Sequence, residues 1–263
     1  NPFYVEELLN HLHDRGLDPH RHGDLVNLDW PASLRSLVLS RIDRLHPPLP
    51  PVLKAASITG LQFALSGVQA CQLGLPVPAG CDERQSLLGF LQALADVGMT
   101  SPLPGEVEPT FSFRHRVTQE VAYDSIARPD RVQLHQRLAE YLESAPTGTT
   151  AGRAQVLAHH WARAGRPDRA WPHLLRAGDE AAAGYANEMA LSAFTQVLDW
   201  LPESALPERI ATLLRREALF DLLGRHPARR DDLAELTLLA GGLEPAAAAA
   251  LRWQVALRQA RLA

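Results

Sequence analysis

The stretch "FSFRHRVTQEVAYDSI", residues 111–126, decides how the middle of this chain is interpreted. Phe111 and Phe113 alternate through a serine, as side chains do on a short strand, and a helical pattern follows them. Arg114, His115 and Arg116 form the entrance to that helix. A strand that runs into a helix with a basic start can read DNA, can sense a phosphate, or can be mere packing.

The residues before this stretch predict three short helices. Ser33 is expected to cap the first, "SLRSLVLSRIDRL", whose apolar residues form one stripe. The second, "VLKAASITG", is expected to end at Gly60. Asp82 is expected to cap the third helix, "DERQSLLGFLQALADVG". The helical spacing of its apolar residues predicts that Val97 lies on its core face.

Two short extended pieces around Pro104 and Gly105 predict a β-hairpin near residues 100–113. We expect this hairpin to be the only β-structure of the chain. Three helices, a two-stranded wing and the helix that starts at His115 are the parts of a winged-helix variant. We therefore expect a winged-helix domain over residues 30–128.

The rest of the chain is expected to be helical, which makes the fold class mostly α. Residues 1–29 are expected to form a helix followed by a polar loop, and residues 129–149 are interpreted as a connecting helix and linker. The histidines between residues 11 and 22 lack the spacing of a helical metal site, so we expect them on the surface.

Residues 150–263 predict stacked helix pairs, and we expect a TPR-like α-solenoid there. Two repeat registers compete for the helix at residues 168–183, so the phase of the repeat stays open. The residues of the first register are Gly178, Ala190, Phe194 and Pro202, and those of the second are Leu157, Ala158, Trp161, Ala170 and Ala177. Small residues in such repeats allow helices to approach closely, while aromatic residues fill the gaps between layers.

Composition narrows the functional classes. The chain has 263 residues, 46% of them hydrophobic, and a net charge of −4, which opposes a dedicated nucleic-acid binder. Cys71 and Cys81 are expected to be reduced thiols. No apolar run of about 20 residues suggests a membrane span, and the start of the chain lacks a secretory pattern. We expect a cytoplasmic fragment of a larger protein, with no membrane partner.

Motifs of catalysis are missing from the sequence. It contains no P-loop, no dinucleotide-binding glycine motif, no H-E-x-x-H and no G-x-S-x-G. The carboxylates are scattered over expected helix surfaces rather than paired in an apolar setting. We therefore expect the fragment itself to have no catalytic residues and to bind no metal.

Several segments together resemble a known family. They are "NPFYVEELL", "WPASLRSLVLSRIDRL", the pattern F-R-H-x-x-x-Q-E-V-A-Y-D-S, and "AHHWARAG" followed by "DRAWPHLLRAGDEA". In this order they resemble the region C-terminal to the ATPase core of bacterial STAND-type, AAA-like ATPases. Those proteins fuse such a core to adenylate/guanylate cyclase domains or to LuxR-type DNA-binding domains. The resemblance covers about residues 1–200 well and fades beyond them. It implies that residues 1–29 are the end of a preceding helical lid and a loop.

The resemblance implies a signal-transduction role in which this chain couples the nucleotide state of an upstream NTPase core to partner binding. Pro2 would belong to a sensor segment that packs beside the adenine, and His115 would contact the β-phosphate, with Arg116 where relatives often have Asp. ATP or ADP would thus be a cofactor only in the full-length protein. The expected partners are the upstream core and a protein or small-molecule effector on the helical repeats, and homo-oligomerisation stays open.

The DNA-reading alternative, a transcriptional regulator that acts through the winged helix, is disfavoured by the acids of the helix after His115. Glu120 and Asp124 follow Arg116 by four and eight residues, which places two acids beside it. A recognition helix needs several exposed basic or amide side chains on one face. The two remaining interpretations of His115 are phosphate sensing, for which a helix N-terminus is well suited, and simple packing and capping.

Overall fold

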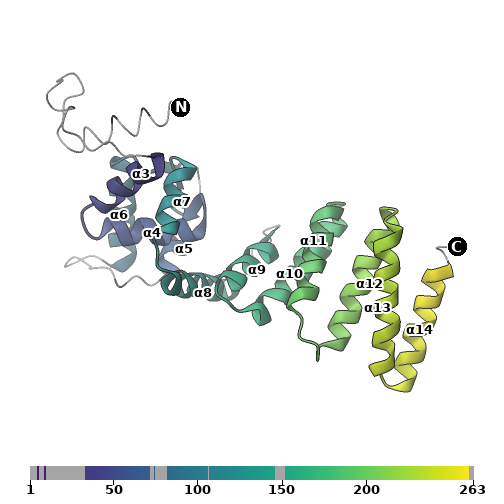
Figure 1. The fold of residues 1–263 in the computed structure, drawn as a ribbon. Coiled ribbons are helices and arrows are strands. Elements are labelled where there is room, and N and C mark those ends of the chain that lie inside the picture. The colour runs from purple at the N-terminus through teal and green to yellow at the C-terminus, as the bar shows by residue number, and fades with distance from the viewer. Residues whose placement is uncertain are drawn as a thin grey trace. The chain divides into compact units, whose positions relative to one another are not determined.

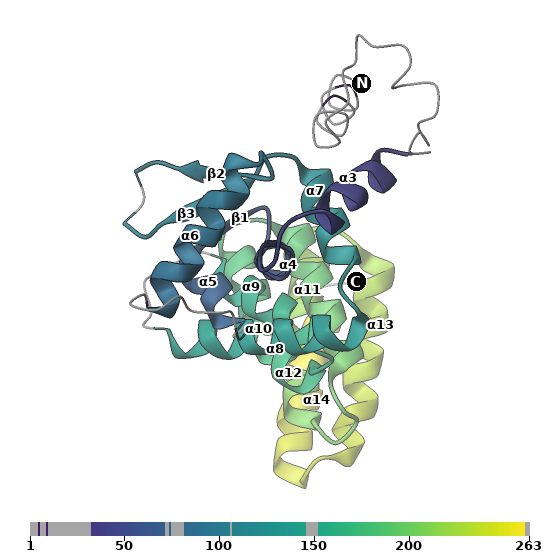
Figure 2. The same cartoon turned by 90° about the vertical axis from the view of Figure 1, so that its left-hand side faces the viewer.

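A computed structural model describes residues 33–71, 74, 82–105, 107–145 and 152–260, together with Val5 and Leu9. Pro2, Cys81, most of residues 1–29 and most of the predicted linker lie outside the described residues. The chain divides into two compact units, Asn1–Ser144 and Ala145–Ala263. Figure 1 shows that the described part is mostly helical. The first unit also contains a small three-stranded sheet, whose strands are labelled in Figure 2.

The first unit contains six helices and three strands among its described residues. In chain order the elements are α3 (Leu34–Asp43), α4 (Leu49–Thr59), β1 (Gln62–Ala64), α5 (Leu65–Ala70), α6 (Glu83–Asp96), β2 (Thr100–Leu103), β3 (Thr110–Phe113), α7 (Arg116–Asp124) and α8 (Arg128–Ser144).

The predicted helix starts are confirmed by hydrogen bonds. Ser33 caps α3, because its side chain accepts from the Ser36 amide at 3.2 Å, and the side chain of Ser36 completes a capping box. Asp82 caps α6 by accepting from the amide of Gln85 at 2.6 Å. Gly60, with φ +127°, ends α4 as expected, since other residues rarely adopt this conformation.

The expectation that the hairpin is the only β-structure is wrong. A third strand, β1, pairs antiparallel with β3, so the sheet order is β1-β3-β2. Phe63 of β1 is buried and its ring lies 6.0 Å from that of Phe111 and 5.4 Å from that of Phe113. A strand of three residues is too short for period-two alternation to reveal it, and pairing with a distant strand stabilises it instead.

The core of the first unit joins the sheet to the helices around it. Val121 of α7 is buried in this core as expected. The placement of Val97 on the core face of α6 is wrong, because Val97 follows the last residue of the helix and is 42% exposed. Helix α8 packs against α4 and α5 and so belongs to the first unit.

The second unit consists of helices that pack successively along the chain (Figure 1). They are α9 (Arg153–Arg163), α10 (Pro167–Ala183), α11 (Asn187–Trp200), α12 (Leu206–Leu222), α13 (His226–Leu239), the short 3-10 turn η1 (Ala240–Gly242) and α14 (Pro245–Ala260). Because α10 packs against both α9 and α11, each of the two competing registers corresponds to a helix pair of the structure.

Three of the turns in this unit share one conformation. Gly165, Tyr185 and Gly224 have positive φ values and follow α9, α10 and α12. In each turn the next residue donates its amide to the carbonyl five residues earlier, as Arg166 does to Trp161 at 3.0 Å. Recurrence of this C-terminal turn gives α9–α10, α10–α11 and α12–α13 similar local connections.

Gly178 of α10 lies in close contact with the buried ring of Phe194 on α11. A Cβ atom at residue 178 would lie 2.6 Å from Phe194 Cε1, well inside van der Waals contact. The expected role of small residues in this region, to let helices approach closely, is confirmed at this position.

We expect Gly178→Ala to destabilise the second unit by about 1–3 kcal/mol, because the added methyl group must displace a buried ring. Four of the five tryptophans, at positions 161, 171, 200 and 253, lie in this unit, so tryptophan fluorescence during urea unfolding reports on it. Gly184→Ala is the matched control: the nearest atoms there lie at 3.5 Å and 3.6 Å, so we expect no loss. Equal stability of the two variants would contradict this account of the α10–α11 contact.

Candidate functional site at the β3–α7 junction

The predicted site residue His115 lies at the N-terminus of α7. Its backbone is extended, with φ −136° and ψ 138°, and its carbonyl accepts the first helical hydrogen bond, from Thr118 N at 3.0 Å. The preceding residue, Arg114, donates its amide to Met99 O at 3.2 Å, which ties the junction to the start of β2. The sheet and the helix therefore both determine where His115 lies. Pro2, the other predicted site residue, lies outside the described residues.

The imidazole of His115 does not cap α7. It makes no side-chain hydrogen bond to the first turn of this helix, a turn that the structure describes in full. The residue is half-buried and its Nε2 atom is buried. The capping part of the packing interpretation is thus wrong, and His115 directs one ring nitrogen into the protein.

Two exposed arginines flank His115. Arg116 Nε donates to Glu120 Oε1 at 2.9 Å, but the Arg116 side chain is 82% exposed, so this pair contributes little to stability. The first turn of α7 contains no acidic residue. A helix N-terminus of this kind, with basic neighbours, favours a negatively charged group by its free amides and by the helix dipole.

Other contacts fix α7 to the rest of the unit. Gln119 Nε2 donates to Ser57 O of α4 at 2.8 Å. Asp124 pairs with Arg35 of α3 and lies 3.9 Å from Arg131 of α8. Sequence reasoning placed Asp124 beside Arg116, whereas the structure engages it with arginines from two other helices. Helix α7 is therefore linked to α3, α4 and α8.

A polar pair behind α7 was not predicted from the sequence. His135 of α8 is almost fully buried, and its Nε2 lies 3.1 Å from Tyr123 Oη. Arg131 lies over the ring of Tyr123, 5.1 Å from its centroid. The pattern of polar and apolar residues in α8 does not predict this contact, because the contact depends on how α7 and α8 pack against each other.

A network of buried ion pairs in the second unit was also missed. Glu217 of α12 has a side chain that is 0% exposed, and it accepts from Arg229 Nε of α13 at 2.7 Å and from Arg258 of α14. Arg229 Nη1 lies 2.8 Å from Asp221 Oδ1, an ion-pair distance at an angle that does not give a hydrogen bond. This network joins three helices through one carboxylate.

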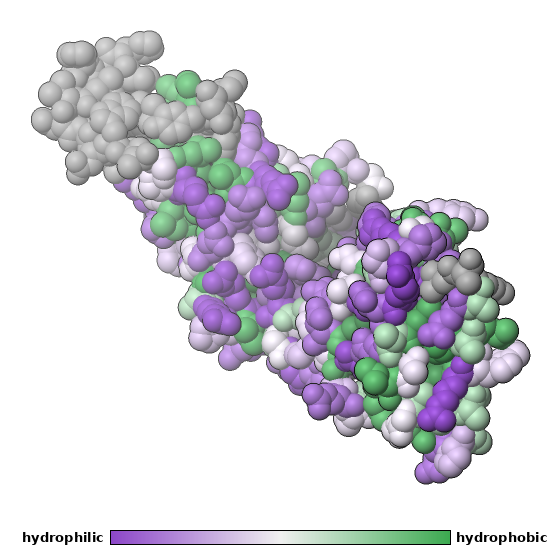
Figure 3. Space-filling model, turned by 45° about the vertical axis from the view of Figure 1, so that its right-hand side comes forward, coloured by the Kyte–Doolittle hydropathy of each residue, from purple (hydrophilic) through white to green (hydrophobic). Residues whose placement is uncertain are grey.

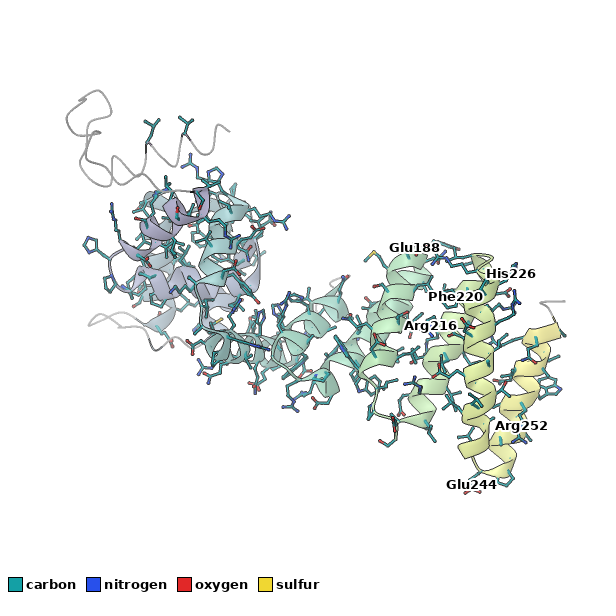
Figure 4. All side chains as sticks on the ribbon, in the orientation of Figure 1. Glu188, Arg216, Phe220, His226, Glu244 and Arg252 are labelled. Atoms are coloured by element: carbon teal, nitrogen blue, oxygen red, sulfur yellow. The ribbon has the colours of Figure 1, made fainter. Side chains whose placement is uncertain are left out.

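Further ion pairs link α12 to its neighbours. Arg216 Nε donates to Asp232 Oδ2 at 3.1 Å, and the guanidinium lies 5.8 Å from the centroid of the Phe220 ring. Burial raises the pKa of Asp232 despite the favourable charge of Arg216. Figure 4 shows Arg216 and Phe220 on α12 and Glu188 at the start of α11, where Glu188 pairs with Arg225. These contacts join neighbouring helices of the second unit.

The histidine doublet of α9 is not arranged as a metal site. The rings of His159 and His160 are 5.3 Å apart, and His160 is buried. Within the described ranges, no group of three or more His, Cys, Asp or Glu side chains is placed to hold a metal ion. Burial lowers the pKa of His160 to about 4, with a smaller contribution from the charge of His159.

This pKa predicts an acid-sensitive second unit. Because His160 stays neutral in the folded state, its contribution to the free energy of unfolding is complete above its ordinary pKa of 6.5. This contribution is lost as the pH falls from 6.5 toward 4. The loss amounts to at most about 3 kcal/mol. Urea unfolding followed by tryptophan fluorescence should show a shallower pH dependence over this range for His160→Gln than for the wild type. The same pH dependence of stability in His160→Gln and in the wild type would contradict this role of His160.

The last described helix has two apolar sides. One side, with Ala248, Leu251 and Val255, is buried. The opposite side contains Trp253 and Leu257, which are 66% and 47% exposed, and alanines at the same helical spacing. Figure 3 shows hydrophobic residues at the surface of the C-terminal helices. A helix that is apolar on both sides is typical of one that is covered by other protein.

Comparisons with known proteins show no family for this chain. No family model matches the chain, and no solved structure matches it. An uncharacterized protein of Rhizobium meliloti (strain 1021) is 26% identical over 250 residues, which cover 89% of this chain and 23% of that protein. The chain thus spans less than a quarter of the length of this relative. Among the described helices, none combines the length and the apolar character needed to cross a membrane.

Proposed function

We propose that this chain is a regulatory and interaction module of a multidomain signalling ATPase, linked to a cyclase or to a transcriptional output. The module couples the nucleotide state of an upstream ATPase core to the binding of a partner or effector. The observation that carries the proposal is the β3–α7 junction, where a half-buried histidine and two arginines meet a helix N-terminus. The length of the Rhizobium meliloti relative is consistent with a module inside a longer protein.

The first unit is, in this proposal, a winged-helix domain. Its elements from α4 to β3 follow the order helix, strand, helix, helix, strand, strand, and its sheet order is β1-β3-β2. Both features fit a helix-turn-helix core with a two-stranded wing. Strand β1, which was not predicted from the sequence, supports this assignment because it pairs with β3 next to the two strands of the wing.

The second unit is, in the same proposal, a TPR-like α-solenoid that binds the partner or effector. Successive packing of its helices, the shared turn conformation and the close contact between Gly178 and Phe194 support this assignment. The exposed apolar side of α14 offers a surface for another protein segment.

A nucleotide phosphate fits the residues at the junction. The free amides of α7, the positive end of its dipole and the side chains of Arg114 and Arg116 all favour an anion, and no acid lies in the first helical turn. The ATPase core would supply the P-loop and the metal chemistry. His115 would contribute an imidazole nitrogen that bonds a phosphate oxygen of the diphosphate, which holds the module on the core in the resting state.

The alternative is a DNA-binding regulator that uses the winged helix, and the scarcity of basic residues in α6 argues against it. In that fold α6 would enter the major groove, yet its only basic residue, Arg84, is paired with Glu108 at 3.1 Å. Binding to DNA depends on neutralising phosphates with Lys and Arg. A mobility-shift titration at low and high salt with the 263-residue chain decides this point, and we expect no tight, salt-sensitive complex.

The proposal is tested by mixing this chain with its separately produced ATPase core. We expect the chain to bind the core more tightly when the core holds ADP than when it holds a non-hydrolysable ATP analogue. The two affinities, measured by calorimetry, should differ by roughly tenfold or more if one phosphate contact is lost. Equal affinities in the two nucleotide states would contradict coupling.

A further inference from the structure

The face formed by α6 and the β2–β3 hairpin is acidic. Only one basic residue, Arg84, occurs in residues 82–113. The acidic residues of this segment that the structure describes are Asp82, Glu83, Asp96 and Glu108. This face therefore repels nucleic acid and attracts a positively charged partner.

A groove of about 320 Å³ lies on this face, between α6 and the two strands of the hairpin. Figure 2 shows α6 beside β2 and β3. Leu88 and Ala95 of α6 form one wall, and Pro102, Leu103 and Phe111 of the strands form much of the other. Asp96, which is exposed, also lines the groove. The groove thus combines an apolar interior with an acidic edge.

The hairpin is fixed to the helices, so the groove exists before any partner binds. Glu108 accepts hydrogen bonds from the amide and the hydroxyl of Ser66 on α5, both at 2.9 Å, and from Arg84 of α6 at 3.1 Å. Val107, the neighbour of Glu108, is fully exposed beside this anchor. A preformed groove lowers the entropy cost of binding.

The edge of the sheet limits how a partner can bind. β2 is an edge strand of the described sheet, and it contains Pro102, which has no amide to donate. Extension of the sheet by a partner strand would require regular donors along this edge. Insertion of side chains into the groove is therefore the favoured mode.

We propose that the α6–hairpin groove docks a basic protein segment, which inserts aliphatic side chains between α6 and the hairpin while a Lys or Arg side chain faces Asp96. The inference rests on the proposed role as an interaction module and names the chemistry of one partner. The acidic excess of this segment favours a basic protein over DNA. The apolar groove favours a segment with aliphatic side chains over a simple polycation.

The test uses the 263-residue chain and fluorescence anisotropy with short synthetic helical peptides. The probe carries Leu at helical spacing flanked by Lys, and matched peptides replace Lys by Glu or Leu by Ser. We expect the Lys/Leu peptide to bind at least about tenfold more tightly than either matched peptide. Asp96→Lys and Leu88→Gln should each weaken its binding by a similar factor, with circular dichroism to verify that both variants fold.

Glu203→Lys, which makes the same charge change at an exposed position in the second unit, is the matched control and should bind as the wild type does. The proposal is overturned by absence of binding to the Lys/Leu peptide, by unchanged binding to the Asp96→Lys chain, or by tighter binding of a short DNA duplex. The titration contains neither nucleotide nor ATPase core, so its failure is distinguishable from failure of the nucleotide-coupling experiment.

Discussion

Replacing Glu217 by alanine is expected to lower the free energy of unfolding of the second unit by about 3–5 kcal/mol. The reason is that Glu217 is fully buried and bonds two arginines, of which Arg229 is only 1% exposed. Without this carboxylate, the half-exposed Asp221 is the ion-pair partner that remains for Arg229 among the residues that the structure describes. Urea unfolding followed by tryptophan fluorescence measures the loss, because four of the five tryptophans lie in this unit.

A double-mutant cycle separates the lost ion pair from lost packing. Glu217→Leu with Arg229→Met removes both charges at similar volume, so we expect it to be more stable than either single variant. Glu203→Ala, at an exposed position, is the control and should change stability by no more than about 0.5 kcal/mol. If Glu217→Ala behaves like Glu203→Ala, the network does not hold the three helices together.

Replacing His115 by alanine in the intact parent protein is expected to weaken ADP retention and to raise basal output. Loss of one hydrogen bond to a phosphate is worth on the order of 1–3 kcal/mol, which shifts a two-state equilibrium roughly ten- to a hundredfold. Because the side chain does not cap α7, the first unit should stay folded. The output activity of the parent protein measures the change in basal output, and circular dichroism checks that the first unit stays folded.

Val121→Ala is the control for this prediction. Val121 lies in the core of the first unit with 4% exposure, so its truncation creates a cavity and should lower the thermal unfolding midpoint. It should leave the affinity for ADP close to that of the folded wild type. A loss of ADP affinity in both variants would indicate that His115→Ala acts through folding rather than through a phosphate contact.

Local signals in the sequence predicted much of the fold. The caps at Ser33 and Asp82 and the helix end at Gly60 follow from hydrogen bonding and backbone conformation within a few residues. Strand β1 could not be predicted in this way, because its three residues are stabilised by pairing with β3 about fifty positions later in the chain. Val97 was misplaced because helical periodicity does not indicate where the helix ends.

The candidate site was predicted in part. The strand-to-helix pattern around His115 placed this residue at the start of α7, where the structure has it. The sequence did not indicate that Asp124 pairs with Arg35 or that Glu217 pairs with Arg229. Both contacts join different helices, so they depend on tertiary packing rather than on spacing along one helix.

The rate at which ADP leaves the intact parent protein tests the central claim most directly. A fluorescent ADP analogue is loaded onto the wild type and onto His115→Ala, and its release is followed after addition of excess unlabelled ADP. If His115 bonds the diphosphate as proposed, ADP should leave the His115→Ala variant about ten to a hundred times faster than it leaves the wild type. Release from Val121→Ala should be close to that from the wild type. Equal release rates for the wild type and His115→Ala would contradict a contact between His115 and the nucleotide.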